Sequence, residues 1–100
     1  MDWPPIPAEV MGILGPITVR LVEQALDDEG QTSQGTWRSN TRTIEITITG
    51  HPANDWWTLY HELAHSYLDD LRITLPAGKE ERVCDAVGVG RLHEMLDTLK

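Results

Sequence analysis

Hydrophobic and polar residues alternate most regularly near the middle of the chain, over residues 41–49. Ile44, Ile46 and Ile48 are separated by threonine and glutamate. A period of two residues predicts a β-strand with one buried face. With residues 35–38 and a turn at Ser39-Asn40, this segment predicts a β-hairpin. Because only one face is apolar, we expect an antiparallel or edge strand whose isoleucines face the core.

The N-terminal third has apolar residues at helical spacing. They recur from Pro16 to about residue 28, at Ile17, Leu21, Val22, Ala25 and Leu26. Proline suits the first helical turn, where its missing N–H is not needed, and Gly30 follows as a C-terminal cap. We therefore predict a helix over residues 16–28, and a shorter one before it over residues 8–14.

Two longer helices are predicted in the C-terminal half. The first begins at Asn54 or Asp55, either of which can cap it, and ends near residue 69 or 70. Its apolar row predicts a helix that other elements cover on most sides: Trp57, Tyr60, Ala64, Tyr67 and Leu71. The last helix runs over about residues 79–99, with Val83 among its core positions. Gly88 and Gly90 lie inside it, where glycine allows close approach to the preceding helix.

These elements predict a single α+β domain over residues 1–100, with an N-terminal helix, a small antiparallel or mixed sheet and two packed helices. A chain of 100 residues and 11.3 kDa has room for one core. The formal net charge of -8 disfavours nucleic acid and anionic membranes as partners. No apolar run approaches the roughly 18 residues of a membrane span. The N-terminus resembles no signal peptide and Cys84 is the single cysteine, so we expect a cytoplasmic protein.

Residues His61 to His65 carry the pattern H-E-x-x-H inside the strongest predicted helix. Side chains four residues apart project from one face, so the two imidazoles can bind one metal ion from adjacent turns. Glu62 lies beside that face, where it can take a proton from a metal-bound water. The composition gives about a 1% expectation of a chance match. Since polar groups on a buried helix need partners, we predict a metal site.

A catalytic zinc usually has three protein ligands, so one more is required. Asp69 is on the same helix but about 12 Å along its axis from His61, and it could reach a shared ion only if the helix broke. Acidic residues also open the last helix, after a loop that can reverse the chain direction. Glu81 and Asp85 lie on one face there, which offers one ligand and one carboxylate to orient an imidazole. Glu80 is an alternative to Glu81, because the phase of a helix near its predicted start is not fixed by the sequence.

H-E-x-x-H with a downstream E-x-x-x-D resembles the gluzincin branch of zinc metallopeptidases. More narrowly, residues 35–88 are similar to ImmA/IrrE-type and other small phage-associated metallopeptidases. The resemblance implies a minimal zincin-like fold with His61, His65 and Glu81 as Zn²⁺ ligands, Glu62 as general base and Asp85 as a partner of His61. It also implies that the isoleucine-rich strand is the upper rim of a cleft, where a peptide could add as an extra strand.

The chain departs from that family in two ways. Cys84, Val87 and Gly88 stand at apolar positions of the ImmA/IrrE pattern. No transition-state-stabilising residue can be assigned, and the only candidates are Tyr60, Tyr67, His51 and His93. Trp56 is a further residue that could flank a substrate groove. We expect a zinc-dependent endopeptidase acting on a peptide or protein substrate; the alternative is a zinc-binding interaction module without catalysis, such as a phage accessory protein.

Overall fold

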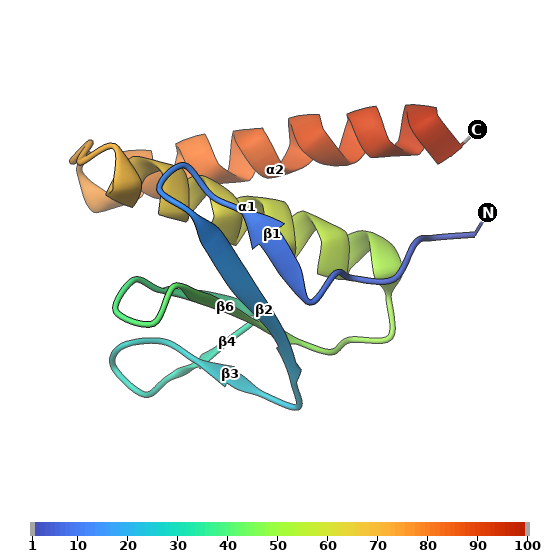
Figure 1. The fold of residues 1–100 in the computed structure, drawn as a ribbon, viewed down its shortest axis with the longest axis horizontal. Helices are drawn as coiled ribbons and strands as arrows, with labels where there is room; N and C mark the ends of the chain where they lie inside the picture. The colour runs from blue at the N-terminus through green and yellow to red at the C-terminus, as the bar shows by residue number, and fades with distance from the viewer. Residues whose placement is uncertain (1, 100) are drawn as a thin grey trace.

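A four-stranded sheet and two long helices make up the computed structural model, which describes residues 2–99 (Figure 1). The sheet has the order β1-β2-β6-β5 and a separate pair is formed by β3 and β4. The strands are β1 (Glu9–Met11), β2 (Pro16–Val22), β3 (Ala25–Leu26), β4 (Thr32–Ser33), β5 (Gly35–Arg38) and β6 (Thr43–Thr47). They are followed by the helices α1 (Pro52–Asp70) and α2 (Ala77–Leu99). The predicted α+β class is confirmed.

The N-terminal third is β structure, so the predicted helices over residues 8–14 and 16–28 are wrong. In β2, Ile17 and Val19 are buried, while the residues between and beside them are exposed. This strand pairs antiparallel with β1 and parallel with β6, where Val19 lies opposite Ile44. Ile17 and Leu21 fit a period of two as well as a helical spacing, and pairing with β6 decides between them.

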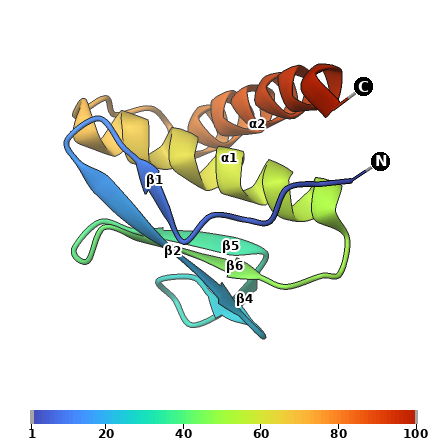
Figure 2. The same ribbon diagram turned by 45° about the vertical axis from the view of Figure 1, so that its right-hand side comes forward.

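The predicted hairpin is confirmed, but the place of its second strand is not. β5 and β6 pair antiparallel, with Trp37 opposite Ile44. Ile44 and Ile46 are fully buried, whereas Ile48 lies beyond the end of β6 and is 54% exposed. β6 is an inner strand that pairs parallel with β2 and antiparallel with β5, so the antiparallel prediction holds on one side only and the edge position is wrong. Its apolar face packs against α1, which crosses one side of the sheet (Figure 2).

The core lies between the sheet and α1, and α2 packs on α1 from the side away from the sheet (Figures 1 and 2). Its buried members are Ile17, Val19, Ile44, Ile46, Trp56, Leu59 and Leu63. α1 begins earlier than predicted, with Pro52 in its first turn and no side-chain cap. The expected cap Asp55 is inside the helix, where its Oδ1 accepts a 2.7 Å hydrogen bond from the Thr49 hydroxyl.

α2 contributes few fully buried side chains. Its buried residues are Cys84 and Gly88, and Val83, which was expected in the core, is 41% exposed. A Cβ atom at Gly88 would lie 2.9 Å from Nε1 of Trp57, so the predicted close approach to α1 is confirmed there. At Gly90 an added Cβ would meet nothing within 4 Å, so the close approach predicted at this second glycine is wrong.

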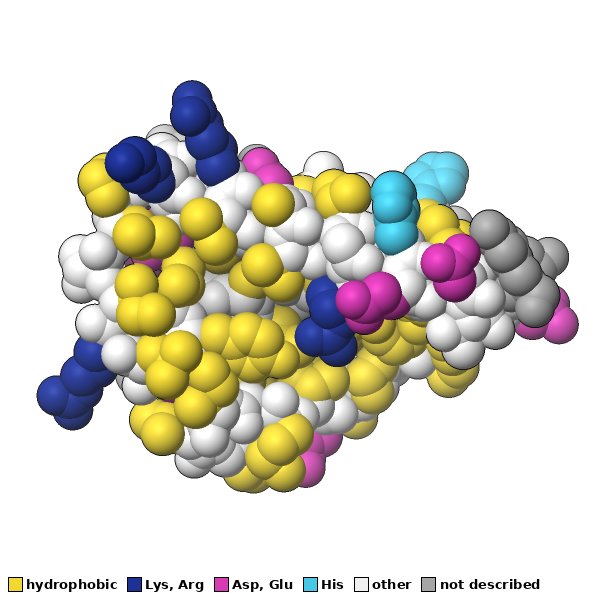
Figure 3. All heavy atoms as spheres, turned by 90° about the horizontal axis from the view of Figure 1, so that it is seen from above, with side chains coloured by type: hydrophobic (Ala, Val, Ile, Leu, Met, Phe, Trp, Pro, Cys, Tyr) yellow, Lys and Arg dark blue, Asp and Glu magenta, His cyan; other side chains and the backbone are white. Residues whose placement is uncertain are grey.

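Large apolar side chains are exposed where the β1–β2 turn lies near the end of α1: Met11, Ile13, Leu14 and Leu71. The backbone N–H of Leu14 donates to Asp70 at 3.2 Å, which joins the turn to that helix. Figure 3 shows apolar side chains gathered on the face seen from above the helices, with Lys and Arg projecting at its edge. Within residues 2–99, neither helix combines the length and apolar character that a membrane span requires.

Candidate metal centre

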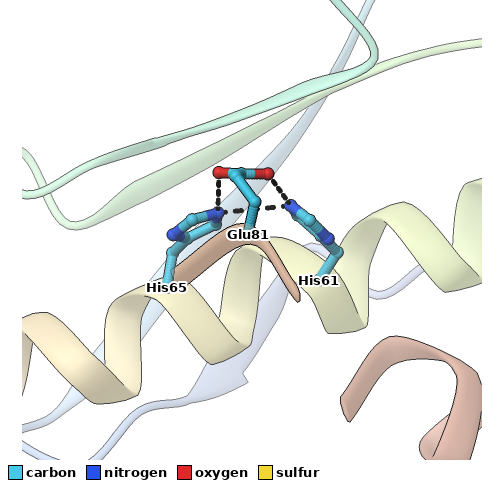
Figure 4. Close-up of side chains that lie close together, drawn as sticks. All are labelled: His61, His65 and Glu81. Carbon is cyan, nitrogen blue, oxygen red and sulfur yellow. Dashed lines mark hydrogen bonds and ion pairs between the residues drawn. The ribbon is translucent and has the colours of Figure 1, made fainter. Parts of the chain in front are cut away.

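Two histidines on α1 and a glutamate on α2 converge at one point (Figure 4). His61 and His65 lie on successive turns of α1, with their Nε2 atoms 3.2 Å apart. From α2, Glu81 places one carboxylate oxygen 2.9 Å from Nε2 of His65 and the other 3.2 Å from Nε2 of His61. The three ligand atoms lie within 4.8 Å of one another. The three residues predicted as ligands are therefore brought together.

The spacing of these donor atoms suits a single small divalent ion. Ligand bonds of about 2.0–2.1 Å in a tetrahedral zinc site place neighbouring donors about 3.3 Å apart. The closest donor pairs here are 2.9–3.2 Å apart. Two imidazoles and one carboxylate form a donor set that zinc accepts in catalytic sites, with a further position left for water or substrate. The residues present therefore fit zinc.

Each imidazole has a second carboxylate at its other nitrogen. Oε2 of Glu80 lies 2.7 Å from Nδ1 of His65, in a well-directed hydrogen bond. Oδ1 of Asp85 lies 2.9 Å from Nδ1 of His61, where it was predicted to lie. That second contact lacks hydrogen-bond direction, and the buried Nδ1 of His61 has no hydrogen-bond partner. A carboxylate at Nδ1 holds the proton there and leaves Nε2 free for a metal.

Glu80 therefore does not lie at the position of the third metal ligand, for which it was the alternative to Glu81. Its carboxylate contacts the far side of His65 and does not join the group formed with Glu81. Asp69 also lies outside that group, and its Oδ2 accepts a 3.1 Å hydrogen bond from Nε1 of Trp37. The role of Glu80 beside His65 was missed because it depends on how α2 is rotated against α1. Two adjacent glutamates at the start of the helix were the only signal for it.

Glu62 lies beside the cluster and beneath the edge strand β5. Its Oε2 is 3.9 Å from Nε2 of His61, and the residue is 8% exposed. Burial is the main cause that raises the pKa of Glu62 to about 7, and the negative charge of Glu81 is a smaller cause in the same direction. His65 and a backbone hydrogen bond from Trp37 act on this pKa in the opposite direction. A carboxyl group with a pKa near 7 can accept and return a proton at neutral pH.

Gly35 makes room for Glu62 at the start of β5. A Cβ atom there would lie 2.5 Å from Cγ2 of Thr58 and 3.1 Å from Cγ of Glu62. Strand and helix therefore approach more closely than a side chain at position 35 would allow. Sequence reasoning missed this role of Gly35, although a glycine inside a strand is a known sign of close backbone approach.

An open cleft of about 800 Å³ surrounds the cluster. α1, β5, the β3–β4 turn and the start of α2 all contribute to its lining. β5 is the edge strand on this side, so the rim of the cleft is β5 and not the isoleucine-rich β6 that was expected. A peptide strand would therefore have to add beside β5.

The indole of α1 that flanks the cleft is that of Trp57, and not that of Trp56, which was considered for this place. Trp56 is 8% exposed and belongs to the core, with Nε1 donating to the carbonyl of Pro4. Trp57 lines the cleft instead, with its ring centre 5.0 Å from that of His61, and Trp37 lines it from β5. Among the described residues, the lining contains no tyrosine and no histidine besides the two ligands. The four residues considered as candidates for transition-state stabilisation therefore lie outside it: Tyr60, Tyr67, His51 and His93.

Cys84 is buried on α2, one residue before Asp85. Burial and, to a smaller extent, the charges of the surrounding carboxylates raise the pKa of its thiol to about 12. A thiol that stays protonated at neutral pH is a poor metal ligand and nucleophile. Cys84 therefore acts as a small core residue, as the sequence predicts.

No protein-family model, curated protein or solved structure matches this chain. The resemblance to gluzincins therefore stays a prediction, and it rests on the residues of the cluster and of the cleft.

Proposed function

We propose that this protein is a zinc-dependent endopeptidase of the gluzincin type. One observation carries the proposal: two imidazole nitrogens of α1 and a carboxylate of α2 meet within 4.8 Å, beside the buried carboxyl group of Glu62. A site that only stabilised the fold would need ligands but no buried base. The open cleft gives a substrate access to the same point.

In this proposal His61, His65 and Glu81 hold the metal. Bound Zn²⁺ would supply Lewis acidity, which activates a water molecule and polarises the substrate carbonyl. Glu62 accepts a proton as water adds to the carbonyl carbon, and returns it to the amine as the C–N bond breaks. The raised pKa of Glu62, about 7, suits both transfers. Glu80 keeps the imidazole of His65 oriented through its hydrogen bond, and Asp85 places a negative charge 2.9 Å from Nδ1 of His61.

The variant Glu62→Gln tests this assignment because it keeps the size of the side chain and leaves all three ligands in place. We expect it to retain one zinc per chain and to lose hydrolysis of a denatured protein by about 100-fold or more. Glu94→Gln, on an exposed part of α2, is the matched control and should keep wild-type activity. Full zinc-dependent activity in Glu62→Gln would reject the mechanism, and a chain that retains no zinc after incubation with excess metal would reject the site.

A second function is favoured by one feature of the cleft. In the part of the chain that the structure describes, no Lys, Arg or Tyr side chain lines it to stabilise a developing oxyanion. The alternative is therefore a zinc-binding interaction module without catalysis. For that function, metal removal lowers the melting temperature and no peptide in a broad library is cleaved. Robust zinc-dependent turnover would eliminate it.

A further inference from the structure

The cleft differs from the rest of the molecule in its charge. Seven carboxylate side chains line it, and no Lys or Arg among the described residues does. The chain as a whole has 8 basic residues to 16 acidic ones, so the lining is more acidic than the chain. Four of the carboxylates belong to the candidate metal site or lie directly beside it: Glu62, Glu80, Glu81 and Asp85. The other three, Asp27, Asp28 and Asp69, have no role in holding the metal.

Asp27 and Asp28 keep most of their negative charge unopposed, whereas the charge of Asp69 acts on Arg42, whose pKa is raised by Asp70 and, less strongly, by Asp69. Oδ1 of Asp27 accepts two backbone N–H groups at 2.9 Å, which closes a turn but adds no positive charge. The side chain of Asp28 is 91% exposed, and Arg38 lies 3.9 Å away, at the limit of an ion pair. That arginine is held more closely by Glu45, at 2.9 Å. The cleft therefore presents a negative potential to a substrate.

Asp69 forms a corner with an indole at one end of the cleft. It accepts the hydrogen bond from Nε1 of Trp37, and both residues belong to the lining. The ring of Trp37 already attracts a guanidinium group, since Cζ of Arg42 lies 5.6 Å from its centre. Arg42 itself is held by both oxygens of Asp70, at 2.8 and 2.9 Å. Asp69 thus lies at the edge of an indole ring whose face attracts cations, and a carboxylate next to an indole is a combination that can bind the end of a Lys or Arg side chain.

We propose that the cleft selects cationic peptide segments, with a Lys or Arg side chain next to the scissile bond bound at Asp69 and Trp37. Asp27 and Asp28 attract further cations along the same segment. This inference rests on the proposed function and names its substrate class. Because the carboxylates are largely exposed, the selection is electrostatic and weakens as salt screens it.

The first test compares two fluorogenic peptides that differ only in carrying Lys or Glu beside the cleaved bond. At low ionic strength we expect kcat/KM to be about tenfold higher for the Lys peptide, and the ratio to shrink in 0.5 M salt. Asp69→Asn should reduce the ratio about threefold, because it keeps an oxygen for Trp37 but removes the charge. Glu9→Gln on β1, an exposed acid outside the cleft, is the matched control and should leave the ratio unchanged.

A binding measurement separates failure of this inference from failure of the proposed function. Zinc-loaded Glu62→Gln is titrated with the same two peptides, labelled for fluorescence anisotropy. Preferential binding of the Lys peptide without any hydrolysis by the wild type would support the cationic preference and reject the peptidase. Equal cleavage or equal binding of both peptides would overturn the cationic preference alone. If neither peptide binds nor is cleaved, both proposals fail.

Discussion

Oε2 of Glu80 lies 2.7 Å from Nδ1 of His65, so the residue that precedes Glu81, the proposed third ligand, contacts one of the two proposed imidazole ligands. α2 thus contributes to the centre through three carboxylates: Glu80, Glu81 and Asp85. Because a carboxylate at Nδ1 fixes the imidazole, its loss weakens the metal site without removing a ligand.

Glu80→Ala should therefore lower zinc affinity by about 10- to 100-fold, as measured by competition with a chromophoric chelator. Glu81→Ala, which removes a ligand, should lower it further. Glu94→Ala on the exposed part of the same helix is the control and should bind zinc as the wild type does. Wild-type affinity in Glu80→Ala would show that this contact does not support the site.

Zinc should stabilise the folded protein, since the three ligands come from two helices that separate on unfolding. At a free zinc concentration of 100 times the Kd, the free energy of unfolding should rise by about 2.7 kcal/mol. For a chain of this size, that corresponds to an increase in Tm of roughly 10–20 °C. Thermal unfolding followed by circular dichroism measures it. A variant with both His61→Ala and His65→Ala should show no increase, and an equal increase would place the bound ion elsewhere.

The raised pKa of Glu62 makes the stability of the metal-free protein depend on pH. Between pH 4.5 and about 7 the folded protein holds a proton on Glu62 that the unfolded chain has released. As the pH rises through this interval, the contribution of Glu62 therefore lowers the free energy of unfolding by about 2–3 kcal/mol. The charges of His65 and Glu81 also act on the pKa of Glu62, and both residues are kept in the variant Glu62→Gln.

Urea denaturation of metal-free wild type and Glu62→Gln at pH 4.5 and pH 8 measures this contribution. Glutamine cannot ionise, so the variant should gain stability relative to the wild type as the pH rises. The gain should have developed fully by about pH 8. A difference between the two proteins that stays constant over this range would contradict the raised pKa.

Gly88 and Gly90 provide a matched pair within one helix. Gly88→Ala places a methyl group 2.9 Å from Nε1 of Trp57, whose ring packs against that of His61. It should lower the free energy of unfolding by about 1–3 kcal/mol and weaken zinc binding. Gly90→Ala meets open space and should raise the free energy of unfolding by about 0.5–1 kcal/mol, through better helix propensity. Equal effects in urea denaturation would contradict the close approach at Gly88.

Local patterns in the sequence were enough to predict the main elements of the second half of the fold. The alternation around Ile44 and Ile46 predicted β6, and the spacing within α1 placed His61 and His65 on one face. The first third failed because Ile17 and Leu21 satisfy both periods, and the strand forms only when β6 lies beside it. Parallel pairing between segments 25 residues apart has no local signal.

Local spacing and tertiary packing also differ in how well they could be predicted within the candidate metal centre. The ligands on α1 follow from a four-residue spacing, which is a property of one helix. The choice between Glu80 and Glu81 depends on the rotation of α2 against α1, which tertiary packing sets. Gly88, lying against Trp57, is part of that packing. The acidic lining of the cleft is even harder to predict from the sequence, since Asp27 and Asp69 lie more than 40 residues apart in the chain.

Only Cys84 and Gly88 of α2 are fully buried, and this helix packs chiefly on α1. Partly buried Leu92 and Met95 add apolar contacts with the core, and an ion bound by both helices would strengthen the attachment of the first turns of α2 to α1. Zinc depletion should then release the whole of α2 and not a single loop, taking Glu80, Glu81 and Asp85 away together. When zinc is removed, the amides of α2 should therefore exchange with solvent before those of α1 and the sheet.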